Sequence, residues 1–339
     1  MNERMNHPFT IPISVLDLAP IMSGSTIADS FQRTIQLAQH TESLGYNRYW
    51  LAEHHNMPFI ASSATSVLIG HVASQTSTIK VGSGGIMLPN HAPLVIAEHF
   101  GTLETLYPGR IDLGLGRAPG TDQKTAQALR RANGSTGDDF PDLLEELRGY
   151  FNPELTPNQT IRAVPGEGLN IPVWLLGSSG FSAQLAGSLG LPFSFASHFS
   201  PNNTLGALDL YRNSFQPSDS MEEPYAMLGV NVIAADTDEE AERLATTLKQ
   251  QFINLIRGKE APLQPPVDDM NDIWTPREKA ALDQQLGASI IGSKETVKRK
   301  LHQFIQQTEA DELMVISQIY DHSARLYSYQ LVSEIFNEE

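Results

Sequence analysis

The sequence predicts an α/β protein that folds as a (β/α)8 TIM barrel, and three observations support this fold class. Short apolar runs rich in β-branched residues alternate with segments of helical periodicity, as in parallel strands joined by helical crossovers. There are eight such runs, the number of strands that closes this barrel. No linker divides the 339 residues, so we expect a single barrel domain over residues 1–339.

Each predicted strand is a short apolar run bounded by turn-forming residues. The first is IPISVLDLAP and the last is ELMVIS. The eight strands are expected at residues 11–20, 48–53, 79–88, 111–118, 172–177, 193–197, 227–235 and 312–317.

The first predicted helix carries both a start signal and a stop signal. Thr26 can cap its N-terminus, with Asp29 at the third helical position as in a capping box. Apolar residues at helical spacing follow, and Gly45 ends the helix. Further helices are expected near residues 62–75 and 91–106, between the next pairs of strands.

Two segments are longer than the connections of a barrel require. One is Ala118–Asn170, which is rich in Gly, Pro and Asp, and the other is Gly258–Gly287, which contains APLQPPVDDMNDIW. Long connections of this kind are usually lids or surface loops. We therefore expect insertions at about 118–170 and 258–287, at the active-site face of the barrel.

The composition excludes several classes of function. The net charge of −16 at pH 7 disfavours binding to nucleic acid or to an anionic membrane. The chain has no cysteine, which excludes disulfides and thiolate chemistry. The sequence starts without a signal-peptide core and has no apolar run that could span a membrane. We expect a cytoplasmic protein with neither a nucleic-acid nor a membrane partner.

Polar residues and glycines follow five consecutive predicted strands, beginning with the second. The enzymes that use this barrel place their chemistry at the C-terminal ends of the strands. One polar strand end is expected by chance, whereas five in a row indicate a site. The residues at these ends are His54 and His55, Ser83 to Gly85, Arg117, Gly177 to Gly180, and His198.

The adjacent histidines His54 and His55 allow three interpretations: metal ligands, an acid/base group, or structural residues. Neighbouring side chains on a strand point to opposite faces, so both can bind one ion only if the backbone turns sharply. No H-E-x-x-H motif and no cysteine ligand is present. We predict no metal site. One imidazole is expected to be structural, and the other to face the barrel mouth as an acid, base or hydrogen-bond donor.

Gly84 and Gly85 interrupt an apolar strand. They indicate either a bulge or tight packing, or the close approach of a flat ligand to bare backbone. Arg117 could pair with a structural carboxylate or clamp a phosphate. The run GSSGFSAQLAG offers hydroxyls and N–H groups at a helix start, which is a natural anion site. Together, Arg117 and Ser178–Gly180 form a plausible phosphate cradle, and no Walker A or Rossmann motif is present.

Three stretches resemble the bacterial luciferase-like flavin-dependent monooxygenases, over about Pro12 to Ser200. They are WLAEHHNMP, VGSGGIMLPNHAPLVIAEHFGTLETLYPGRIDLGLGRAPGTD and VWLLGSSGFSAQLAGSLGLP. The subgroup resembled is the short-chain luciferase-like oxidoreductases. The resemblance implies a (β/α)8 barrel that forms a homodimer. It also implies reduced FMN and O2 as cosubstrates, a separate flavin reductase that supplies FMNH2, and a small organic substrate that the sequence does not identify.

The resemblance also assigns roles to individual residues. His54 matches the histidine that assists the oxygen chemistry of the reduced flavin, and His55 would orient it. Ser83, Gly84 and Gly85 match the small residues beside the isoalloxazine, where a cis non-prolyl peptide is common. Arg117 matches the arginine that binds the FMN phosphate, and Ser178, Ser179 and Gly180 complete that site.

Two departures from luciferase itself limit what the resemblance implies. Gly116 stands where luciferase has a reactive cysteine, and residues 258–287 do not match the luciferase lid. Light emission and a long-chain aldehyde substrate are therefore not predicted. Two alternatives stay open: an oxidoreductase that uses the deazaflavin F420 for hydride transfer, and a flavin-binding protein without catalysis. Binding of each reduced cofactor, and oxygen uptake with FMNH2, distinguish them.

Overall fold

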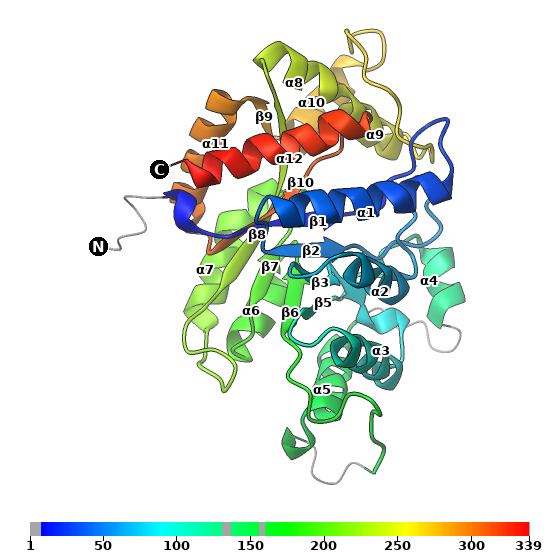
Figure 1. Ribbon diagram of the computed structural model, residues 1–339, viewed down its shortest axis with the longest axis vertical. Coiled ribbons are helices and arrows are strands. Elements are labelled where there is room, and N and C mark those ends of the chain that lie inside the picture. The colour runs from blue at the N-terminus through cyan, green and yellow to red at the C-terminus, as the bar shows by residue number, and fades with distance from the viewer. Residues whose placement is uncertain (1–7, 131–136, 156–159, 339) are drawn as a thin grey trace.

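The computed structural model describes residues 8–130, 137–155 and 160–338, and its centre is a closed barrel of parallel strands (Figure 1). Neighbouring strands follow the order β1-β2-β3-β5-β6-β7-β8-β10, and β10 pairs with both β8 and β1 to close the barrel. The predicted (β/α)8 fold is confirmed. The barrel strands are β1 (Ile13–Asp17), β2 (Arg48–Leu51), β3 (Lys80–Ser83), β5 (Ile111–Gly116), β6 (Val173–Gly177), β7 (Phe193–Phe195), β8 (Ala226–Ala235) and β10 (Glu312–Ile316).

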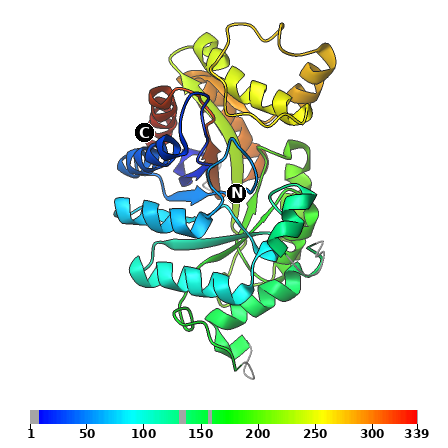
Figure 2. The same cartoon turned by 90° about the vertical axis from the view of Figure 1, so that its right-hand side faces the viewer.

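Helices surround the barrel (Figures 1 and 2). The predicted capping box is confirmed: the Thr26 hydroxyl accepts from the Asp29 amide at 3.1 Å, and Asp29 Oδ2 accepts from the Thr26 amide at 2.8 Å. The surrounding helices are α1 (Ile27–Ser43), α2 (Thr65–Gln75), α3 (Pro93–Leu106), α5 (Phe140–Phe151), α6 (Gly180–Ser188), α7 (Thr204–Ser214), α11 (Lys294–Thr308) and α12 (His322–Asn337). Short 3-10 turns are η2 (Pro8–Thr10), η3 (Leu88–Asn90), η4 (Pro153–Leu155) and η5 (Pro201–Asn203).

The first expected insertion, residues 118–170, is only partly an insertion. It contains α4 (Gln123–Arg130) and α5, and α5 packs against α3. Helix α5 is therefore the regular barrel helix between β5 and β6. The sequence expectation missed this because Gly, Pro and Asp surround the helix. Residues 131–136 and 156–159 of this segment lie outside the described residues.

The second insertion is larger than the expected residues 258–287 and contains its own elements. Helices α8 (Asp238–Leu244), α9 (Thr246–Ile256) and α10 (Pro276–Gln285) lead to strand β9 (Ile290–Ser293). Strand β8 extends beyond the barrel: its first half pairs with β10, and residues 232–235 pair with β9. The insertion buries a separate apolar cluster that includes Ile233, Leu248 and Ile291.

This larger insertion, residues 238–293, covers part of the C-terminal end of the barrel, as expected for an insertion at the active-site face. Leu263 donates its amide to the Ile21 carbonyl at 2.9 Å and accepts from the Ser23 amide at 2.8 Å. Both partners lie in the loop after β1. Figure 2 shows the molecule from this side, with the insertion at the top of the picture.

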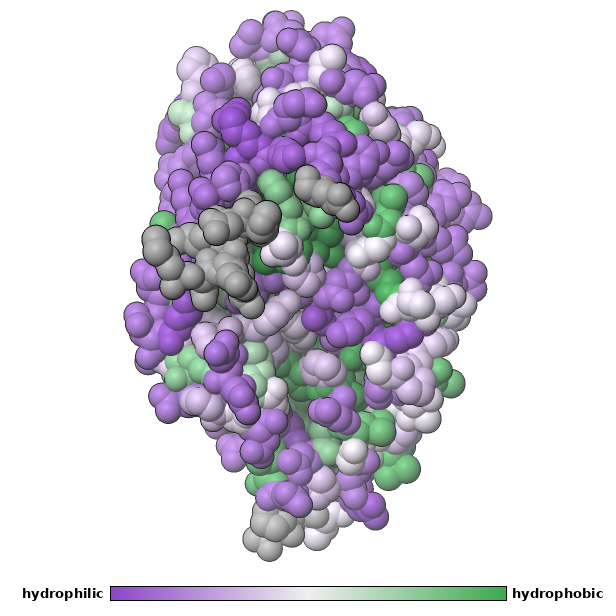
Figure 3. Space-filling model, turned by 60° about the vertical axis from the view of Figure 1, so that its left-hand side comes forward, coloured by the Kyte–Doolittle hydropathy of each residue, from purple (hydrophilic) through white to green (hydrophobic). Residues whose placement is uncertain are grey.

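Figure 3 shows a mainly hydrophilic face on which apolar residues gather in hollows. No helix in the described part of the chain is both long and apolar enough to cross a bilayer.

Candidate active site

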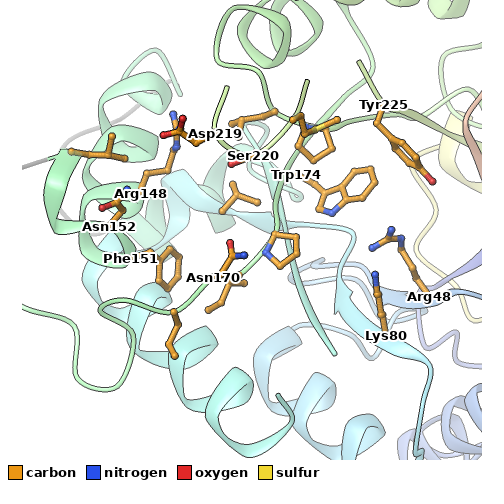
Figure 4. A pocket seen from close by; sticks show the side chains of 18 residues that line it. Arg48, Lys80, Arg148, Phe151, Asn152, Asn170, Trp174, Asp219, Ser220 and Tyr225 are labelled. Carbon is orange, nitrogen blue, oxygen red and sulfur yellow. The ribbon is translucent and has the colours of Figure 1, made fainter. Parts of the chain in front are cut away.

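Two cavities lie at opposite ends of the barrel. The larger, of about 580 Å³, is lined by residues at the beginnings of strands, such as Arg48, Lys80 and Val173 (Figure 4). Arg48 is held by Asp112 at 2.7 Å and Glu312 at 3.0 Å. The N-terminal end of a TIM barrel serves stability, and the C-terminal end carries the chemistry. The candidate active site is therefore the smaller cavity.

The smaller cavity, of about 340 Å³, opens at the C-terminal ends of the strands and is mostly apolar. Most small-molecule sites combine such apolar walls with a few polar groups. The polar lining residues are His54, Thr121, His198, Asn231, Gln251, Gln318 and Arg325, and the apolar ones include Leu18, Met57, Phe59, Phe199, Phe252, Leu255, Leu263 and Ile316.

His54 lies just beyond β2 and lines this cavity. Its Nδ1 lies 3.1 Å from the Gly120 carbonyl. A carbonyl can only accept, so Nδ1 must carry the proton of the hydrogen bond. Burial lowers the pKa of His54 below its ordinary value, so the neutral form is favoured at pH 7. In that form Nε2 is unprotonated and can act as a base or acceptor.

His55 points away from His54, to the buried carboxylate of Glu53. The distance from His55 Nε2 to Glu53 Oε1 is 2.8 Å, and His91 Nε2 lies 2.9 Å from the same oxygen. The Met87 amide donates to Glu53 Oε2 at 3.0 Å. Burial of Glu53 opposes ionisation, but the hydrogen bonds from His55 and His91 outweigh it and lower the pKa of Glu53 to about 2.

The Glu53 cluster also bears on the metal interpretation. Ligand atoms of Glu53, His55 and His91 lie within 4.8 Å of one another, a spacing that could hold an ion. The hydrogen bonds between these groups account for the same spacing, because one carboxylate satisfies both imidazoles. The absence of a metal site stays a prediction. Sequence reasoning did not include Glu53 or His91 in the site, although Pro89-Asn90-His91 directly follows the third predicted strand.

The predicted glycine pair joins β3 to β4 (Ile86–Met87) through a cis peptide between Gly84 and Gly85. A Cβ on Gly85 would lie 2.7 Å from the carbonyl oxygen of Gly114 on β5. The glycines are thus required by tight packing, one of the two interpretations that the sequence allowed. The Ser83 hydroxyl donates to the Gly114 carbonyl at 2.8 Å and is fully buried. Contacts of Ser83, Gly84 and Gly85 with a cofactor stay predictions.

Arg117 lies beside the start of α6, the helix that follows β6. The Arg117 guanidinium carbon lies 4.3 Å from the ring centre of Phe181, in the first turn of α6. Ser179 is the N-cap of α6 in extended conformation, and no side-chain cap of this helix is found among the described residues. The first amides of α6 are therefore open for an anion beside a guanidinium. Ser178 and Gly180 flank this N-cap.

Three lining residues that sequence reasoning did not assign come from β7, β8 and α9. Burial lowers the pKa of His198 to about 4, so its imidazole is neutral at pH 7. Asn231 donates its amide to the His198 carbonyl at 3.4 Å. Gln251 is buried on α9. His198 had been noted only as a strand end, and no sequence signal marks Gln251, because its helix lies in the unpredicted part of the insertion.

The comparisons with known proteins agree with this fold. The model of the luciferase-like monooxygenase family matches residues 11–312. A luciferase-like monooxygenase of Escherichia coli K12 is 54% identical over 97% of this chain and 98% of its own. The N-acetyl-S-alkylcysteine monooxygenase of Bacillus subtilis is 33% identical over 96% of this chain and 98% of its own.

Solved structures show the same barrel. The crystal structure of apo-MsnO8 has a TM-score of 0.85 and 36% identity, and the match covers 96% of this chain and 98% of that one. Two more distant structures share the fold. The oxygenating constituent of 3,6-diketocamphane monooxygenase from Pseudomonas putida, in complex with FMN, has a TM-score of 0.69 and 19% identity over 96% of this chain and 97% of that one. An F420-dependent secondary alcohol dehydrogenase has a TM-score of 0.67 and 11% identity over 96% and 98%. The family match and the high identities confirm the resemblance: the chain belongs to the luciferase-like monooxygenase family.

Proposed function

We propose that this protein is an FMN-dependent monooxygenase that uses reduced FMN and O2 to oxidise a small organic substrate. The observation that carries the proposal is the open N-terminus of α6 beside Arg117. Within the described part of the chain Arg117 forms no ion pair, in contrast to the buried arginines Arg48 and Arg325. A phosphate would satisfy both the guanidinium and the helix amides.

The residues present fit FMN. Arg117, Ser178, Ser179 and Gly180 would hold its phosphate, and the segment Ser83–Gly85 would lie beside its ring. When bound in reduced form, FMN supplies the electrons that activate O2. The barrel strands and the Glu53 hydrogen bonds hold these groups in place before the cofactor arrives.

His54 would exchange the proton of the oxygen chemistry through Nε2. Its Nδ1–H bond to Gly120 fixes the tautomer that leaves Nε2 free, as a general base requires. His55, held by Glu53, would position the chain at His54 without touching the cofactor. The apolar cavity wall and residues 238–293 would exclude water from the reaction.

Partners and assembly follow from the same proposal. A separate flavin reductase would supply FMNH2 in the cytoplasm, because the cofactor must arrive reduced. The FMN complex of a structural neighbour supports the flavin, and the F420 enzyme of the same fold keeps the deazaflavin alternative in the test. Val67 on α2 and Leu106 on α3 are 69% and 62% exposed. A homodimer that covers these apolar side chains would remove them from water.

The test is a set of cofactor titrations with Arg117→Ala. The binding free energy of FMN should become less favourable by about 1.5–3 kcal/mol, the usual contribution of a charge-assisted hydrogen bond. Riboflavin lacks the phosphate and should bind the variant and the parent protein equally. Arg117→Lys should retain part of the affinity, and Arg299→Ala, on the exposed side of α11, is the control. Equal losses for FMN and riboflavin would refute the cradle.

Two further measurements separate the alternatives. Tighter binding of reduced F420 than of FMNH2 would identify the deazaflavin enzyme. Oxygen uptake with FMNH2 is then measured with and without a panel of small amides, ketones and thioethers. Uptake that no panel member couples to an oxygenated product would support a flavin-binding protein without catalysis.

A further inference from the structure

Gln251 carries an unusual feature at the wall of the candidate active site. The residue is only 5% exposed, and neither Oε1 nor Nε2 of its amide has a hydrogen-bond partner among the described residues. Because both atoms are unpaired, turning the amide over changes nothing, so the observation does not depend on which atom is oxygen. Leaving such a group unpaired destabilises the fold, because the group has given up its hydrogen bonds to water. Buried polar groups in native proteins are normally satisfied.

The neighbours of Gln251 show that this is a local exception. Thr247 donates to the Gln264 carbonyl at 2.9 Å, and Gln250 donates to the Pro265 carbonyl at 2.9 Å. Both bonds tie α9 to the strap of residues 262–267. Gln251, on the same helix, faces the cavity instead. Helix α9 therefore presents one free amide to the cavity while its other polar side chains hold the insertion together.

The cavity lies apart from the proposed flavin cradle. None of Ser83, Gly84, Gly85, Arg117 and Ser178–Gly180 lines it, whereas His54 does. Its walls come from the ends of β1, β7, β8 and β10, from the insertion, and from the loops after β2 and β5, which contribute His54 and Thr121. The ligand of Gln251 would thus share one cavity with His54 without touching the residues of the cradle.

We infer that Gln251 recognises the substrate, and that the substrate is a small apolar molecule whose polar end is a neutral amide, either a primary carboxamide or a lactam. Such a group offers one donor and one acceptor on the same edge, which pair with the Gln251 oxygen and nitrogen in two hydrogen bonds. This inference rests on the proposed function for the identity of the reaction, but the recognition itself needs no flavin contact.

The charges of the cavity favour a neutral amide over a carboxylate. Within the part of the chain that the structure describes, Arg325 is the one cation that lines the cavity, and Asp17 already pairs with it at 2.9 Å. A carboxylate would enter a mostly apolar space without a free counter-charge, which is costly. A volume of about 340 Å³ is at the small end of ligand sites. The rest of the molecule should be compact and apolar, to match Phe199, Phe252 and Leu255.

The test compares two probes of the same shape, 3-phenylpropanamide and 4-phenylbutan-2-one, in which a methyl group replaces the amide NH2. Calorimetric titration of flavin-free and FMN-saturated protein should show the amide binding at least about tenfold more tightly, because the ketone can accept from Gln251 Nε2 but leaves the buried Oε1 without a donor. In Gln251→Met the two probes should bind within about twofold of each other, since methionine keeps the length and loses both polar atoms. Gln250→Met is the matched control and should keep the tenfold preference.

Several results would overturn the inference. One is equal binding of the two probes to the parent protein, and another is no amide binding up to its solubility limit. A preference that survives in Gln251→Met would also overturn it. A loss of FMN affinity in Gln251→Met would assign the amide to the flavin ring instead. Failure of the proposed function is separate: FMN would not bind the parent protein, while the amide preference of the flavin-free protein would remain.

Discussion

Glu53 connects the ends of neighbouring strands at the site. Its carboxylate accepts from His55, His91 and the Met87 amide, so one buried charge holds the loop after β2 against the segment after β4. A buried carboxylate is stable only with such partners. The same contacts turn His55 away from the cavity and leave the cavity side to His54.

The low pKa of Glu53 makes the stability of the protein depend on pH. The carboxyl is ionised in the fold down to pH about 2, against about 4.5 when unpaired. The stability it contributes is therefore present above pH about 4.5 and is lost as the pH falls toward 2. From pH 5 to pH 3 the loss should be about 2 kcal/mol. Urea unfolding of the parent and of Glu53→Gln should give free-energy curves that converge over this range, and parallel curves would contradict the assignment.

His54 and His55 should differ sharply when each is replaced. His54→Ala should bind reduced FMN almost normally but lose a factor of about 10²–10⁴ in product formation, the usual contribution of a positioned base. Oxygen uptake should then release hydrogen peroxide. His55→Ala should chiefly lower the unfolding free energy, because Glu53 loses a partner. Full coupling of oxygen uptake to product in His54→Ala would remove the histidine from the mechanism.

At the scale of elements, strands β3, β4 and β5 approach one another so closely that only glycine fits between them. A Cβ on Gly85 would lie 2.7 Å from a backbone oxygen of β5, whereas a Cβ on Gly84 would meet the end of the Leu16 side chain at 2.6 Å. Backbone cannot move aside as a side chain can. Gly85 therefore sets the spacing between its segment and β5.

Replacement of Gly85 should thus affect the fold as well as any cofactor. Gly85→Ala should cost about 1–3 kcal/mol of unfolding free energy, the range for overpacking, and Gly84→Ala should cost less. If the pair also lies beside the flavin, Gly85→Ala should weaken both FMN and riboflavin. Urea unfolding measures the first effect and flavin titration the second. A variant that loses stability but binds flavin normally would show that the glycines serve packing only.

On the scale of the whole molecule, the two ends of the barrel have different tasks. The N-terminal end contains a buried network in which Arg48 bonds Asp112 and Glu312, and Trp50 donates to Asp112 at 3.1 Å. The neighbouring carboxylates raise the pKa of Arg48 above its ordinary value. The C-terminal end carries the smaller cavity, the proposed phosphate cradle and the insertion. The stabilising ion-pair network and the candidate active site thus lie at opposite ends of the strands.

This separation predicts a variant that loses stability without losing cofactor affinity. Arg48→Met leaves two buried carboxylates without their cation and should cost about 3–5 kcal/mol, measured by urea unfolding. FMN affinity of the folded variant should equal that of the parent. Arg162→Met is the control: its ion pair with Glu167 is 67% exposed on the arginine side, so its loss should leave the unfolding free energy almost unchanged. A weaker FMN complex in Arg48→Met would show that the two ends are coupled.

The sequence by itself determined the features that depend on near neighbours along the chain. The eight strands are apolar runs, and the capping box of Thr26 and Asp29 spans three residues. Parallel topology then places every strand end at one face, so Arg117 and the start of α6 could be paired without coordinates. Only the tertiary structure decided which distant groups meet. His91 reaches Glu53 across 38 residues, β9 forms because β8 extends beyond the barrel, and Gln251 faces the cavity because the insertion folds over the strand ends. The physical reason is that such contacts arise from packing between elements, and a side chain's local sequence does not indicate its partner.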